Sequence, residues 1–232
     1  MASDPGFFEA FYATAWQHPW LLWAAALAGV AVALSRSTLH PSLRRYALAL
    51  GVLSALDAWL TSSHVYGIGP KSPPWDSFVP LFFVLAGDFR YLLLAVAGTP
   101  DGRLAASARG VATALGLTVI VPIASQLVLA SLPEPWSGSR VLFLVYELMF
   151  FALAGALAKW HPNVAGTAWL RSLTRYVQLY YGLWATADIV ILATGSDLGF
   201  ALRVVPNVLY YGGLIGAIAW LGARANAGAA DA

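Results

Sequence analysis

The stretch Phe78–Gly98, FVPLFFVLAGDFRYLLLAVAG, is 21 residues long and almost entirely apolar. At about 1.5 Å per residue, a helix of this length crosses the hydrocarbon core of a bilayer. Its eleventh residue is Asp88, so a carboxylate lies near the middle of the predicted span, two residues before Arg90. A charge at the bilayer centre costs about 2.5–3.5 kcal/mol even on the mildest scale, and such residues are usually functional. The stretch therefore predicts a membrane-spanning helix that contributes to a polar interior.

The composition of the whole chain agrees with a membrane protein. Of its 232 residues 59% are hydrophobic and only 10% are charged, whereas soluble domains carry about 25% charged residues. The chain has no cysteine, which excludes disulfides, thiolate metal sites and cysteine nucleophiles. Its first seventeen residues contain Asp4 and Glu9 but no lysine or arginine, so we expect no cleaved signal peptide. We expect an integral membrane protein of a plasma membrane or a bacterial inner membrane.

Apolar runs separated by turn-forming residues predict an all-α bundle of seven transmembrane helices in one domain, 1–232. The predicted helices are His18–Leu34, Tyr46–Ser62, Phe78–Gly98, Val111–Leu132, Val141–Ala158, Tyr176–Thr194 and Phe200–Leu221.

The distribution of lysine and arginine predicts the orientation of this bundle. Nine basic residues fall on one side of a seven-helix arrangement, and three, Lys71, Arg140 and Arg203, fall on the other. Because cytoplasmic loops carry the excess of positive charge, we expect the N-terminus outside and the C-terminus in the cytoplasm.

Short sequence matches suggest that a three-helix unit is used twice. Leu27-Ala28-Gly29 recurs as Leu153-Ala154-Gly155, and Val79-Pro80 recurs as Val205-Pro206 at the same offset. These matches indicate parallel repeats over 18–98 and 141–221, joined by the helix 111–132. Chance is the alternative, since leucine, alanine and glycine are frequent throughout the chain.

A 3+1+3 arrangement of helices resembles the layout of SWEET-type and other PQ-loop transporters, and more distantly that of the rhodopsins. The chain contains no Pro-Gln pair, so no functional residues are carried over from that family. A retinal Schiff base needs a lysine inside the seventh helix, and the only lysines, Lys71 and Lys159, lie elsewhere.

Polar residues concentrate in the outer half of the predicted bundle. Counted at about 1.5 Å per residue, Asp57, Glu147 and Asp188 lie roughly 8–10 Å below the outer boundary, and Gln126 lies at a similar depth. We therefore expect an aromatic-walled, outward-facing cavity with Asp88 at its floor.

Helical spacing places further polar and aromatic residues on the faces that carry these acids. Tyr181 and Trp184 share a face with Asp188, and Arg203, Asn207 and Tyr210 share a face of the seventh helix. The predicted substrate- or ion-binding residues are Asp57, Asp88, Gln126, Glu147, Tyr181, Trp184, Asp188, Arg203, Asn207 and Tyr210.

Structural roles are the alternative for each of these residues. Asp57 and Asp188 can cap helix ends, Glu147 can lie at the membrane interface, and Asp88 can form a structural ion pair. Residues two apart on a helix point about 200° apart, so Arg90 is a poor partner for Asp88. Arg90 can instead extend toward the inner boundary.

Several carboxylates in one low-dielectric pocket cannot all stay ionised, so such a site can exchange protons or hold a cation. The first hypothesis is a proton- or cation-coupled transporter of a small solute. The second is an intramembrane enzyme acting on a lipid or isoprenoid, a cyclase, isomerase or hydrolase with Asp88, Glu147 and Asp188 as catalytic acids. Small seven-helix terpene cyclases are similar in size and also need acidic residues. The third is a non-catalytic membrane subunit or receptor.

The sequence contains no motif of the common hydrolases, zinc proteases or nucleotide-binding proteins. There is no G-x-S-x-G, H-E-x-x-H or P-loop sequence, and the four histidines fall at predicted helix ends or in loops. We expect no cofactor, no metal and no nucleic acid; the expected partners are the lipid bilayer and a small-molecule or lipid ligand. The segment His64–Ser77 is expected to be an ordinary connector or a lid over the cavity.

Overall fold

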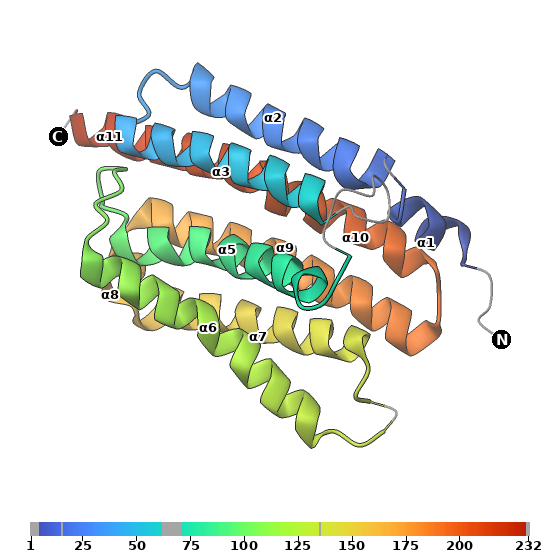
Figure 1. Ribbon diagram of the computed structural model, residues 1–232. Helices are drawn as coiled ribbons and strands as arrows, with labels where there is room; N and C mark the ends of the chain where they lie inside the picture. Colours follow the sequence, from blue (N-terminus) through green and yellow to red (C-terminus); the bar gives the residue numbers. More distant parts are fainter. Residues whose placement is uncertain (1–4, 15, 62–70, 135, 231–232) are drawn as a thin grey trace.

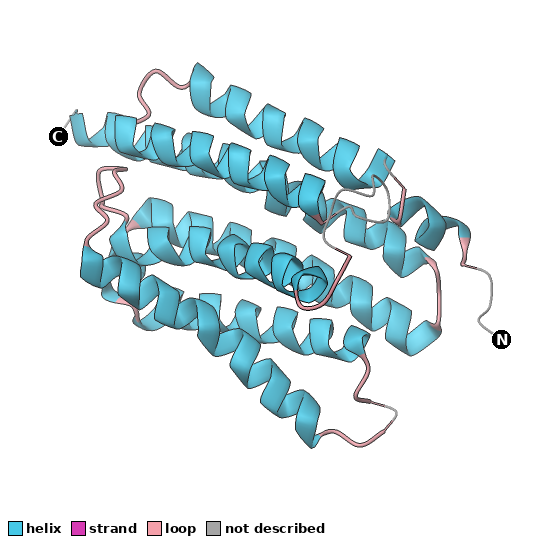
Figure 2. Cartoon of the chain, viewed as in Figure 1, coloured by secondary structure: helices cyan, strands magenta, loops and turns pink. Residues whose placement is uncertain are grey.

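The computed structural model describes residues 5–14, 16–61, 71–134 and 136–230. Throughout these residues the regular structure is helical, and the β-type pairing is confined to an isolated bridge between Gly98 and Leu104 (Figure 2). The all-helical class predicted from the sequence is therefore confirmed for the described part of the chain.

Figure 1 shows the helices coloured in chain order. In chain order they are α1 (Phe7–Tyr12), the π-helical η1 (Trp16–Trp20), α2 (Leu21–Ser35), α3 (Pro41–Leu60), α5 (Trp75–Ala97), α6 (Ala108–Ser131), α7 (Ser139–Trp160), α8 (Pro162–Gly166), α9 (Ala168–Thr194), α10 (Leu198–Val208), the π-helical η2 (Leu209–Gly213) and α11 (Leu214–Ala230).

Five helical segments of the described residues are long and apolar enough to cross a bilayer: Trp75–Ala97, Ala108–Ser131, Ser139–Trp160, Ala168–Thr194 and Leu198–Ala229. The last of these runs through α10, η2 and α11 without a break. The apolar helix α2 is shorter, at 15 residues. Helix α3 has 20 residues, but Arg44, Arg45 and Asp57 lie among them.

Several helix boundaries differ from the prediction because helices continue past the apolar stretch. Helix α9 begins at Ala168 rather than Tyr176, and Arg171 and Arg175 in its added turns are exposed. The predicted break after Trp160 contains the short helix α8, with Pro162 at its first position, where a missing N–H costs nothing. Residues 62–70 lie outside the described residues, so the last residue of the second predicted helix and the first half of His64–Ser77 are not tested.

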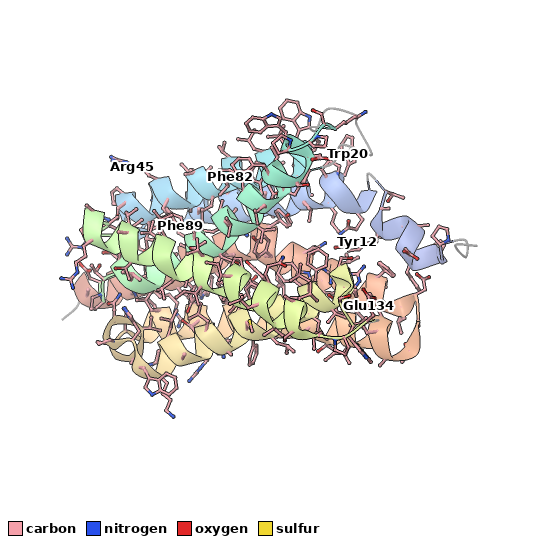
Figure 3. The ribbon with its side chains drawn as sticks, turned by 60° about the horizontal axis from the view of Figure 1, so that its bottom comes forward. Tyr12, Trp20, Arg45, Phe82, Phe89 and Glu134 are labelled. Carbon is pink, nitrogen blue, oxygen red and sulfur yellow. The ribbon has the colours of Figure 1, made fainter. Side chains whose placement is uncertain are left out.

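The long helices run side by side between two ends of the bundle (Figure 1). One end holds α8, the 98–107 connection and the C-terminal end of α11; the other holds α1 and the corner between α9 and α10. Figure 3 shows Arg45 at the first end and Tyr12 and Glu134 at the second.

The core lies where α9 and α11 meet α5, and Leu173, Leu214 and Ile218 are fully buried there. The outer surface is also apolar. On α6, Leu115, Ile123 and Leu127 are each more than half exposed. A soluble protein rarely exposes a contiguous apolar surface of this kind, whereas lipid would cover it.

Candidate functional site

A cavity of 470 Å³ opens in the half of the bundle nearer to α1, and α1, α3, α5, α6, α7, α9, α10 and η2 all contribute to its wall. The fold brings together nine of the ten residues predicted as binding residues: Asp57, Asp88, Gln126, Glu147, Tyr181, Trp184, Arg203, Asn207 and Tyr210 all line this cavity. Asp188 does not line the cavity, but its carboxylate contacts Arg203, which does. That these residues bind a ligand stays a prediction.

Asp88 lies at the meeting point of three helices. Its carboxyl accepts hydrogen bonds from the hydroxyl groups of Tyr146 on α7 and Tyr181 on α9, and the residue is only 2% exposed. The ring of Phe150 stacks on that of Tyr181 at 4.4 Å between centroids, which fixes the direction of the Tyr181 hydroxyl. The donors to Asp88 are therefore neutral hydroxyls.

The opposite part of the wall is an ion-pair cluster. Arg203 pairs with both Asp188 and Glu147, at 3.4 Å from the Glu147 Oε1 atom. Arg140 lies 3.2 Å from the same Asp188 oxygen. Helix α9 continues to Thr194, six residues past Asp188, so Asp188 does not cap its end. The buried Asp188 carboxylate contacts two guanidinium groups beside the cavity.

Asn207 connects α9, α10 and the N-terminal segment. The Trp184 indole donates to the Asn207 Oδ1 atom at 2.9 Å, and the Asn207 Nδ2 atom donates to the Tyr12 hydroxyl at 3.0 Å. Sequence reasoning missed Tyr12, because α1 is short and has no long apolar run. The Asp197 carboxylate accepts from the backbone amides of Phe8 and Glu9, at 2.7 and 2.6 Å, and so fixes the start of α1.

Asp57 forms the α3 side of the cavity. The Thr61 hydroxyl lies 3.4 Å from its Oδ1 atom, and the hydroxyl of Tyr211 is a second donor. Tyr211 also lines the cavity and was not among the predicted residues. Tyr210 and Tyr211 both come from η2, a π-helical segment, and such segments frequently lie at functional sites.

Arg90 is buried beneath this wall. It is 2% exposed, donates to the Gly87 carbonyl at 3.0 Å and to the Ser54 hydroxyl at 3.2 Å, and stacks over the Tyr210 ring at 3.9 Å. No ion pair joins it to Asp88 within the described residues, as the helical spacing predicted. The alternative that Arg90 reaches the inner boundary is wrong, because Ser54 and Tyr210 hold it inside.

The charges of the buried cluster do not balance. Four buried carboxyl groups, Asp57, Asp88, Glu147 and Asp188, lie near three guanidinium groups: the buried Arg90 and Arg203 and the partly exposed Arg140. Arg90 acts on both Asp57 and Asp88. One positive charge is therefore missing, and a proton or a bound cation can supply it.

The described residues give no support to a metal site, since no three of their His, Asp or Glu side chains come together closely enough to hold an ion. Gln126, on α6, lines the cavity and is exposed. It is therefore accessible at the rim.

No protein-family model, no curated protein and no solved structure matches this chain.

Proposed function

We propose that the chain is an integral membrane protein with seven crossings. The five long apolar helices supply five of them, and α2 together with η1, and α3, supply the other two. The exposed apolar side chains on α6 support contact with lipid. In this proposal the end that carries α1 faces outward, the C-terminus is cytoplasmic, and the membrane is a plasma or bacterial inner membrane. The two three-helix repeats stay a prediction.

We propose further that the protein transports a small solute in exchange for, or together with, protons or cations. The observation that carries this proposal is the unbalanced acidic cluster around a cavity in the half of the bundle nearer to α1. A cavity of 470 Å³ is in the usual range for small-molecule sites. Asp88 is the proposed proton- or cation-exchanging group, because neutral tyrosine hydroxyls rather than arginines donate to it.

Reconstituted vesicles test this function. Purified protein is placed in vesicles that contain a pH-sensitive dye, and amines, sugars, amino acids and organic acids are added outside in turn. We expect one class of solute to move the internal pH, and Asp88→Asn to abolish that movement in vesicles that hold the same amount of folded protein. Asp76→Asn is the matched control, because Asp76 lies on the same helix but is exposed and outside the cavity. Normal coupled uptake by Asp88→Asn would contradict the proposal.

One observation favours an intramembrane enzyme as a second candidate. Leu81, Val84 and Phe143 line the cavity and are also 41–49% exposed on the outer surface of the bundle. An apolar rim of this kind gives a lipid or isoprenoid access from the bilayer. In this reading Asp88, Glu147 and Asp188 are the candidate acids. Incubating the purified protein with membrane lipids and isoprenoids, followed by mass spectrometry, separates the two: an enzyme yields a new product and a transporter yields none.

A further inference from the structure

The charge of the cavity wall points to the kind of ligand that fits it. Among the described residues that line the cavity, Asp57, Asp88 and Glu147 carry carboxyl groups, and Arg203 is the one basic residue. Arg203 is already paired with Asp188 and Glu147. The wall therefore repels an anionic ligand and attracts a cationic one.

Aromatic rings cover the same wall. The Tyr181 and Trp184 ring centroids lie 5.6 Å apart, and those of Trp184 and Tyr210 lie 5.0 Å apart. The guanidinium of Arg90 is stacked over Tyr210, so this cluster already holds one cation against an aromatic ring. Aromatic faces attract organic cations, most strongly where water is excluded. The cluster is thus suited to a second cation on the cavity side.

Two buried carboxyl oxygens of this region, Glu147 Oε2 and Asp188 Oδ2, have no donor among the described residues. The Oε2 atom of Glu147 is buried and has no partner among the described residues, whereas its Oε1 atom faces Arg203. Buried carboxylate oxygens are rarely left without a donor. An N–H group of a ligand, or a proton, would satisfy the Glu147 oxygen.

Apolar side chains of α5 and α7 line the cavity beside the acids Asp88 and Glu147 of the same two helices. They are Leu81, Phe83, Val84 and Phe143. A ligand that contacts both kinds of side chain therefore combines a charged nitrogen with a hydrocarbon or aromatic body.

We propose that the cavity binds a protonated organic amine with an apolar substituent, and that binding displaces a proton from the acidic cluster. This rests on the proposed transport function and makes it an exchange of an organic cation for a proton. The cluster needs one positive charge, so the ammonium group takes the place of the proton, which leaves to water. Charge is conserved, because one cation enters as one leaves.

The neighbours of each acid set where the proton is held. Tyr146 and Tyr181 face Asp88 from α7 and α9, and Arg90 acts on it from its own helix. Glu147 faces Arg203, with Asp188 and Arg140 behind it, and Asp57 faces Tyr211 and Arg90. Neither Asp88 nor Asp57 has an ion-pair partner within the described residues. Asp88 is the expected proton donor, because both of its hydrogen-bond donors are neutral hydroxyls from other helices.

Three probes of nearly equal shape and different charge test the proposal: 2-phenylethylamine, 2-phenylethanol and 3-phenylpropanoate. Each is titrated into the purified full chain in detergent at pH 7, and the heat of binding is measured by calorimetry. The titration is repeated in a second buffer with a different ionisation enthalpy, because the difference in heat gives the number of protons released. We expect the amine to bind at least about tenfold more tightly than the alcohol and the carboxylate not to bind. The amine should release up to one proton per molecule bound, and the alcohol none.

Variants separate a binding role from a structural one. Asp88→Asn should abolish proton release on amine binding, and Asp76→Asn should leave it unchanged. If Asp88→Asn does not fold, Trp184→Phe provides the second test, because this variant keeps an aromatic ring but loses the indole. Trp184→Phe should weaken amine binding several-fold and leave proton release unchanged.

Equal binding of amine and alcohol, preferred binding of the carboxylate, or amine binding without proton release would each overturn the proposal. The vesicle experiment distinguishes this from a failure of the transport function. If another class of solute is carried in an Asp88-dependent way, transport stands and the amine inference falls. If the amine binds and releases a proton but is not carried, the binding inference stands and transport falls.

Discussion

The hydroxyl of Tyr181 on α9 donates a hydrogen bond to the carboxyl of Asp88 on α5. This bond joins two helices across the floor of the cavity, and Tyr146 on α7 completes the arrangement with a second one. Because Asp88 and Tyr181 are buried, the bonds bear on both stability and the exchange of a proton.

Replacing Tyr181 with phenylalanine removes this bond and keeps the ring that stacks on Phe150. We expect Tyr181→Phe to lower the free energy of unfolding by about 1–3 kcal/mol, because a buried acceptor loses a donor. Equilibrium unfolding in detergent measures the change. In a double-mutant cycle with Asp88→Asn the two effects should be non-additive by at least about 0.5 kcal/mol; additive effects would show that the two groups do not interact.

The ion-pair cluster predicts a large effect at Asp188. Asp188→Asn leaves Arg140 and Arg203 with Glu147 alone, and removing one partner of a buried charge cluster costs about 3–5 kcal/mol. Thermal or detergent unfolding should show a strongly destabilised protein. Asp101→Asn is the control: its partner Arg103 is 56% exposed, and exposed pairs contribute little. Equal effects of the two substitutions would contradict the burial of the cluster.

Two glycines of the last helical segment should differ in their tolerance of a side chain. A methyl group on Gly212 would overlap the backbone of Ala25 on α2, whereas nothing lies within 4 Å of the corresponding position on Gly216. We expect Gly212→Ala to destabilise the protein by about 1–3 kcal/mol or more, because α2 must move away. Gly216→Ala should be neutral or stabilising, since alanine favours the helix. Similar melting temperatures for both variants would mean that α2 does not approach Gly212 closely.

Asp197 should control the N-terminal helix α1. Asp197→Ala removes the acceptor for the amides of Phe8 and Glu9, a contribution of about 1 kcal/mol for a helix cap. Amide hydrogen exchange over residues 7–12 should then accelerate about fivefold. Asp76→Ala, on a different helix start, should leave that segment unchanged. Unaltered exchange in Asp197→Ala would show that α1 is held by other contacts.

The apolar runs of the sequence predicted the helical class and the approximate position of each long helix. A segment buried in lipid or protein must hydrogen-bond its backbone N–H and C=O groups internally, and a helix does so. The depth of each acid, counted along its helix, predicted that acids of different helices would lie near one another, and helical spacing predicted which residues share their faces. Asp57, Asp88 and Glu147 come from three different helices and line one cavity. That they act on a ligand remains to be tested.

Other features depend on contacts between distant parts of the chain. Tyr12 reaches the cavity because Asp197, far away in the sequence, fixes α1. The burial of Arg90 depends on Ser54 and Tyr210 from other helices. The π-helical segment η2, in which Gly212 lies against the backbone of Ala25 on α2, has no signal in the local residue pattern.

The central claim is that a water-accessible cavity opens at the outer end of a membrane-embedded bundle. The chain has no native cysteine, so a single introduced thiol reports on its own position. Gln126 lines the cavity, and the neighbouring Leu127 is 68% exposed on the apolar surface. In intact cells treated with a charged, membrane-impermeant thiol reagent, we expect Gln126→Cys to be labelled and Leu127→Cys to stay unlabelled. Labelling of Leu127→Cys, or protection of Gln126→Cys, would contradict the account.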